Sequence, residues 1–228
     1  MARKIKIPNE RQKRYKQEEQ RRKIDVRTKR QYYLIVCEGE RTEPNYFQGM
    51  KDDLPRGVLE AYQINIQGTG YNTQSLIDRA LELKKRYEQE NSRPIDRLWV
   101  VFDKDSFSAI DFNNAILRCQ QAGIGCGWSN EAFELWYLLH FHYYSHRMSR
   151  KDYQDAIEEN LKPHEGDSFR YQKNSTKIYA LLKEHGSVND AIRYAKRLAK
   201  EYSDRYDYAN HNPCTMVWQL VEELMKLK

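Results

Sequence analysis

Acidic side chains that directly follow two apolar runs are the residues of this 228-residue chain whose types and spacing best suit catalysis. Glu38 follows the run 32–37, and Asp103 and Asp105 follow the run 98–102. Carboxylates brought close together repel one another unless a cation neutralises them, and hard oxygen ligands of this kind suit Mg²⁺ or Mn²⁺ rather than zinc. The pattern therefore predicts a divalent-metal site.

Both runs must be strands of one sheet if these carboxylates are to meet. Each is short, continuous and rich in β-branched or aromatic residues, as buried strands are. The predicted strands are 32–37, 62–66, 98–102 and 123–128, and the predicted helices between them are 73–90 and 108–121. This order predicts an α/β fold with an open, mostly parallel sheet and flanking helices, in which the carboxyl ends of the strands share one ligand-binding edge.

Beyond residue 128 the apolar spacing becomes helical. The expected helices are 131–142, 152–161, 174–184, 190–202 and 213–226. We expect three parts: a basic, flexible arm at 1–30, an α/β core at 31–128, and a helical part at 129–228 that completes the same domain.

The basic charge of the chain is concentrated at its N-terminus. Residues 1–30 contain 13 Lys and Arg against 4 acidic residues, whereas the whole chain carries only +6. A segment with so few large apolar residues cannot bury enough surface to fold alone, and its charge suits phosphate backbones. A solvated tail without a partner is the alternative. The candidate nucleic-acid-binding residues are Arg11, Lys13, Arg14, Arg21, Arg22, Lys23, Lys29 and Arg30.

Three further residues are candidates for the same metal site. Glu43 suits a second metal ion, although a Glu in the first turn of a helix is also favourable with the helix dipole. Glu131 and Glu134 share one helix face at i,i+3, where Glu131 is either a metal ligand or a partner of the helix cap.

Composition excludes several classes of protein. No apolar run approaches the roughly 18 residues that would span a bilayer, and no apolar segment follows the N-terminal charges. The four cysteines form no CxxC pair, which argues against a zinc knuckle or a disulfide-rich secreted scaffold. We expect a cytoplasmic protein with reduced thiols.

Three separated motifs resemble the RloB family, which is related to Toprim proteins. They are Tyr33 to Phe47 (YLIVCEGERTEPNYF), Val101 to Ser106 (VFDKDS) and Ser129 to Phe141 (SNEAFELWYLLHF). The stretch Asn212-Pro213-Cys214-Thr215 also looks like the Asn-Pro-x-Thr element that precedes the last helix of the family. The resemblance covers roughly residues 31–227 and leaves the basic arm outside.

The resemblance implies a Toprim-like fold with a metal site made by Glu38, Asp103 and Asp105. The stretch Tyr171-Gln172-Lys173 resembles a Tyr-x-Lys element of the family, which implies that Lys173 stabilises a phosphate; a solvated residue at a helix start is the alternative. The related overcoming-lysogenization-defect nucleases use such acids for divalent-metal cleavage of phosphodiester bonds, so the expected activity is a nuclease on RNA or DNA. It further implies a role in anti-phage defence of the abortive-infection type, with an AAA- or ABC-type ATPase encoded nearby as a candidate partner. Self-association is left open.

Two rival interpretations remain. One is a non-catalytic nucleic-acid adaptor in which the arm binds and the acids hold structural Mg²⁺. The other is a phosphatase of the haloacid dehalogenase type, with Asp103 as nucleophile and Asp105 as general acid or base. That signature normally lies on the first strand and precedes Thr, whereas here it follows the third predicted strand and precedes Ser106.

Overall fold

The computed structural model describes residues 13–14, 31–39, 41–55, 59–63, 73–104, 107–202 and 206–227. Contacts within the chain divide it into two units, Met1–Arg30 and Gln31–Lys228. In the first unit, Lys13 and Arg14 are exposed. The rest of this section concerns the second unit.

The second unit is built on an open, mostly parallel sheet of five strands, as the alternation of strands and helices predicts. The strands are β1 (Tyr33–Cys37), β2 (Leu59–Gln63), β3 (Arg97–Asp103), β4 (Gly125–Asn130) and β5 (Cys214–Thr215). Their spatial order is β2-β1-β3-β4-β5, and only β5 is antiparallel to its neighbour. This arrangement is consistent with a Toprim-like fold.

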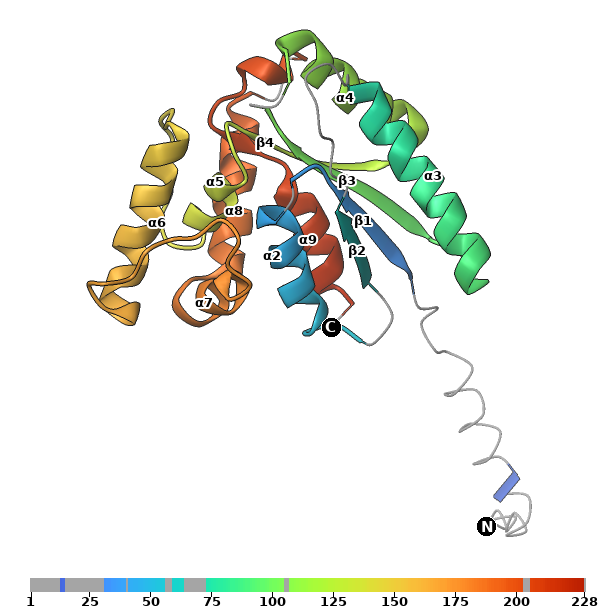
Figure 1. Cartoon of the computed structure of the whole chain (residues 1–228), viewed down its shortest axis with the longest axis horizontal. Helices are drawn as coiled ribbons and strands as arrows, with labels where there is room; N and C mark the ends of the chain where they lie inside the picture. Colours follow the sequence, from blue (N-terminus) through green and yellow to red (C-terminus); the bar gives the residue numbers. More distant parts are fainter. Residues whose placement is uncertain are drawn as a thin grey trace, which may run out of the picture. The chain divides into compact units, whose positions relative to one another are not determined.

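Helices cover both faces of the sheet because the central strands are apolar on both sides (Figure 1). α3 (Thr73–Asn91) and α4 (Ala109–Ala122) cover one face, where Val100 and Phe102 are buried. α2 (Thr42–Lys51) and α9 (Val217–Met225) cover the other face, where Trp99 and Val101 are buried.

The helical C-terminal part packs against this second face and completes the domain core. It consists of α5 (Glu134–Leu138), α6 (Arg150–Glu165), α7 (Ile178–His185) and α8 (Val188–Lys200), together with α9 and the 3₁₀ turn η2 (Tyr208–Asn210). Apolar side chains of α5 to α9 belong to the same buried cluster as those of β1 and β3. None of the helices in the described ranges has the length and apolar character needed to cross a membrane.

Several predicted bounds differ from the structure. The helix expected at 131–142 is shorter, since α5 spans only Glu134–Leu138. The strand expected at 123–128 is β4 at Gly125–Asn130, because Gly123 adopts a left-handed conformation (φ 65°) that ends α4. β5 was missed entirely, since a strand of two residues has no periodicity that a sequence pattern can reveal.

Candidate active site

A cavity of about 330 Å³ lies at the carboxyl ends of β1 and β3 and gathers four carboxylates from four elements. Glu38 follows β1, Glu43 lies in the first turn of α2, Asp103 ends β3, and Glu134 begins α5. The remaining lining residues are Gly39, Arg41, Thr42, Arg150, Lys173 and Asn174. The edge of the sheet that the sequence indicates is therefore a site at which acidic and basic side chains meet.

Backbone hydrogen bonds hold the ends of β1 and β3, which carry Glu38 and Asp103, next to each other. The Glu38 N–H donates to the Val101 carbonyl at 2.9 Å, which continues the β1–β3 pairing one residue beyond β1. Asp103 lies two residues further along β3 and is 8% exposed. Its backbone pairs in register with Ser129, whose buried hydroxyl hydrogen-bonds that of Thr215 at 3.0 Å. The end of β3 is thus held between β1 and the β4–β5 pair.

Glu43 is held as a buried acid against the turn that follows β1. It is 4% exposed, and a Cβ atom on Gly39 would overlap its carboxylate. Glycine at position 39 therefore makes the room that this side chain occupies. Burial, with the negative charges of Glu134 and Glu38, raises the pKa of Glu43 to about 7, although its own backbone N–H and Lys173 act in the opposite direction.

Glu134 is buried but has two side-chain partners at the cavity. Its Oε1 accepts a hydrogen bond from the Tyr171 hydroxyl at 3.3 Å and lies 3.6 Å from Nζ of Lys173. Burial and the charge of Glu134 raise the pKa of Tyr171 well above its usual value, so Tyr171 stays a neutral donor. The Lys173 side chain is 45% exposed and lines the cavity.

Contacts between distant segments tie the loop that carries Lys173 to α2, and α2 to α5. Nδ2 of Asn45 in α2 donates to the carbonyls of Asn174 and Ser175, at 3.1 and 3.3 Å. The Tyr137 hydroxyl donates to the Thr42 carbonyl at 2.9 Å and ties α5 to the start of α2. These bonds fix the loop that carries Lys173 and the first turns of α2 and α5 around one cavity.

Two arginines at the cavity were not predicted from the sequence. Arg41 precedes α2, and Arg150 is the first residue of α6, directly after the Ser149 cap. Ser149 and Asp152 form a reciprocal capping box that fixes this end of α6. Arginines next to an acidic motif or after a helix cap are common on protein surfaces. The sequence therefore does not mark these two as site residues, and only the structure shows that they line the same cavity.

The family model described as RloB-like protein matches residues 33–224. The chain belongs to the RloB-like family. Comparisons with curated proteins and with solved structures gave no match. The matched range contains every residue that lines the carboxylate cavity and leaves the basic residues 1–30 outside.

The candidate residues of this RloB-like chain fall into four groups, one of which is the pair Lys13 and Arg14, exposed in the first unit. Glu38, Glu43, Asp103, Glu134 and Lys173 all line the cavity. Glu131 does not line it, and its Oε2 instead accepts a hydrogen bond from the Asn212 amide at 3.4 Å. Outside the described residues lie Asp105, Arg11, Arg21, Arg22, Lys23, Lys29 and Arg30.

The side chains that line the carboxylate cavity of this RloB-like protein are of the type that binds a hard divalent cation. Four carboxylates line it, and the negative charges of Glu134 and Glu38 contribute to the raised pKa of Glu43. Carboxylate oxygens are the ligands that such a cation prefers. In the described part of the chain, no group of three His, Cys, Asp or Glu side chains is arranged to hold a metal ion. A complete ligand set would therefore draw on Asp105 or on movement of the acidic side chains towards the ion.

Proposed function

We propose that this RloB-like protein is a divalent-metal-dependent phosphodiesterase that cleaves RNA or DNA. The observation that supports the proposal is the single cavity in which Glu38, Glu43, Asp103 and Glu134 are surrounded by basic side chains. Carboxylates suit a hard cation, and arginine or lysine suits the phosphate that the cation engages. A structural ion pair alone would need neither an open cavity nor an excess of acids.

In the proposed mechanism, Asp103 and Glu38 would hold Mg²⁺ or Mn²⁺ together with Asp105, the second acid of the Asp-x-Asp motif. When bound, the ion would supply Lewis-acid polarisation of a phosphate oxygen and would offset the charge that gathers on phosphorus. Glu43 lines the same cavity and is suited by its position to take a proton from the attacking water. In an enzyme with a second ion, Glu43 would instead be a ligand.

The basic residues bind and orient the substrate. Arg41 and Arg150 are exposed at the cavity, so their guanidinium groups can reach phosphate oxygens in a bidentate manner. Lys173 shares its charge between Glu134 and the cavity, where it stabilises negative charge on the phosphate. The basic arm at 1–30 recruits the polyanion that the acidic cavity would otherwise repel.

A cleavage assay with a matched pair of Asp→Asn variants tests the proposal. Labelled supercoiled DNA, single-stranded DNA, tRNA and long RNA are incubated with Mg²⁺, Mn²⁺ or EDTA. We expect metal-dependent products from the wild type and from Asp155→Asn, an exposed position in α6, but none from Asp103→Asn. Equal cleavage by Asp103→Asn and the wild type would overturn the proposed site.

The same variants separate a nuclease from an adaptor. A nuclease whose Asp103 is replaced still binds nucleic acid without cutting it. Binding by the wild type without cleavage on any substrate, with the candidate ATPase present and absent, would favour the adaptor. The proposed role in anti-phage defence rests on the family and is tested by comparing phage plaque numbers in cells that express the wild type or Asp103→Asn.

A further inference from the structure

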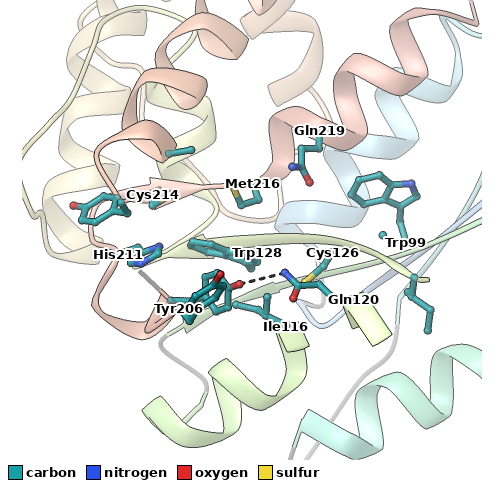
Figure 2. A pocket seen from close by; sticks show the side chains of 15 residues that line it. Trp99, Ile116, Gln120, Cys126, Trp128, Tyr206, His211, Cys214, Met216 and Gln219 are labelled. Atoms are coloured by element: carbon teal, nitrogen blue, oxygen red, sulfur yellow. Dashed lines mark hydrogen bonds between the residues drawn. The ribbon is translucent and has the colours of Figure 1, made fainter. Parts of the chain in front are cut away.

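A second cavity, of about 320 Å³, lies along the outer edge of β4 and shares no lining residue with the carboxylate cavity (Figure 2). It is bounded by α4, the end of α8, η2, β5 and α9. None of the described residues that line it is Asp, Glu, Lys or Arg. Its ligand is therefore expected to be uncharged where it is enclosed, unlike a phosphate or a metal ion.

The floor of this second cavity is a strand edge with backbone groups available for recognition. β5 pairs only with Ser129 and Asn130 of β4, so no described strand pairs with 125–127 on the edge of β4 that faces away from β3. The Met216 N–H donates to the Trp128 carbonyl at 2.8 Å, on the β5 side of β4. Because peptide groups two residues apart in a strand point to the same side, the N–H and C=O of Cys126 face the cavity.

Aromatic rings form the walls of the second cavity. Trp128 packs against Tyr208 with ring centroids 5.9 Å apart, and His211 stacks on Tyr202 at 4.7 Å with an interplanar angle of 13°. Tyr206 lines the same cavity yet is 81% exposed. Glycine at position 125 admits the indole of Trp99, which a Cβ there would overlap. The cavity is thus a partly open aromatic slot.

The lining of the second cavity also contains two side-chain amides and two cysteine thiols. The Gln120 amide donates to the Tyr208 hydroxyl at 3.3 Å, and Gln219 presents a second amide from α9 (Figure 2). Burial raises the pKa of Cys126 well above its usual value and that of Cys214 to about 12. Both thiols stay protonated near neutral pH, which disfavours a thiolate metal site or a nucleophile here.

We propose that the aromatic slot beside β4 binds a purine base. A flat heterocycle stacks on aromatic side chains, and its edge alternates donors and acceptors that match the N–H and C=O of Cys126 and the amides of Gln120 and Gln219. The volume suits a base with its sugar, and the uncharged lining leaves the phosphates in solvent. The base belongs either to a free nucleotide or to a nucleic-acid strand.

Isothermal titration calorimetry on the full chain, with EDTA present, tests this proposal independently of cleavage. The probes are AMP, UMP and a short oligoadenylate. Base stacking on one aromatic side chain is worth about 1–3 kcal/mol, so we expect Tyr206→Ala to weaken AMP binding about 5- to 150-fold. Tyr206→Phe keeps the ring and is expected to stay within about twofold of the wild type.

Two further variants test the location of the slot. Ala199→Phe places a ring inside the cavity and is expected to abolish binding, while Tyr194→Ala, elsewhere on α8, leaves it unchanged. If Ala199→Phe does not fold, as judged by circular dichroism, the Tyr206 pair carries the test.

The outcomes distinguish three occupants of the slot: a free nucleotide, a base of a nucleic-acid strand, and a second protein strand. Saturable AMP binding that depends on Tyr206 supports a free nucleotide, and Tyr206-dependent binding of the oligoadenylate alone supports a nucleic-acid strand. Binding that ignores both Tyr206→Ala and Ala199→Phe, or no binding of any probe, overturns the proposal. If sedimentation instead shows that Ala199→Phe disrupts self-association while no nucleotide binds, the edge of β4 takes a second protein strand and the proposal is wrong.

Discussion

Replacing Glu43 by Gln should stabilise the metal-free protein at alkaline pH. The carboxylate is buried beside Glu134 and Glu38, and its pKa is raised from 4.5 to about 7. An acid whose pKa is higher in the folded state favours folding less as pH rises, because the folded protein resists the ionisation that the unfolded chain undergoes freely. Glutamine keeps the shape of the side chain and removes this penalty.

The size of the effect follows from the shift. Linkage between pKa values of 4.5 and about 7 gives a destabilisation of about 1 kcal/mol at pH 5 that grows to about 3 kcal/mol at pH 8. For a chain of this size, about 3 kcal/mol corresponds to a rise in Tm of roughly 6–12 °C for Glu43→Gln. Urea denaturation in EDTA at both pH values measures the difference.

A control of opposite sign is available at Glu88. Burial alone would raise its pKa, but hydrogen bonds from Lys84 and the Ile95 N–H lower it overall. Glu88→Gln is therefore expected to destabilise the protein at neutral pH. If Glu43→Gln is less stable than the wild type at pH 8 in EDTA, or differs from it equally at pH 5 and pH 8, ionisation of the buried Glu43 carboxylate does not destabilise the folded protein and the prediction is wrong.

Three other predictions concern the cavity and the arm. Gly39→Ala should displace the Glu43 carboxylate and slow metal-dependent cleavage, whereas an unchanged rate of cleavage would show that Glu43 is not needed for the reaction. Ser149→Ala removes the cap before Arg150 and should cost about 1 kcal/mol in urea unfolding, with no loss expected only if the capping box is absent in solution. Replacing the eight candidate basic residues of 1–30 by Gln should flatten the salt dependence of nucleic-acid binding measured by fluorescence anisotropy, and an unchanged slope would remove the arm from the interface.

Local sequence features determined the framework and one half of the candidate site. Strands buried on both faces must be continuously apolar, so β1 and β3 and the acids at their ends could be recognised without a structure. Parallel pairing then required Glu38 and Asp103 to share an edge. Short-range capping likewise fixed the start of α4 at Ser108, which accepts from the Asp111 N–H.

Only the tertiary structure decided which other residues join these two acids. Glu134, Arg150 and Lys173 come from segments whose local patterns are equally typical of solvated helix ends, and packing alone brings them to the cavity. The raised pKa of Glu43 arises from burial and neighbouring charges, neither of which is encoded locally. The aromatic slot beside β4 depends in the same way on a strand of two residues, because β5 stops pairing where the slot begins.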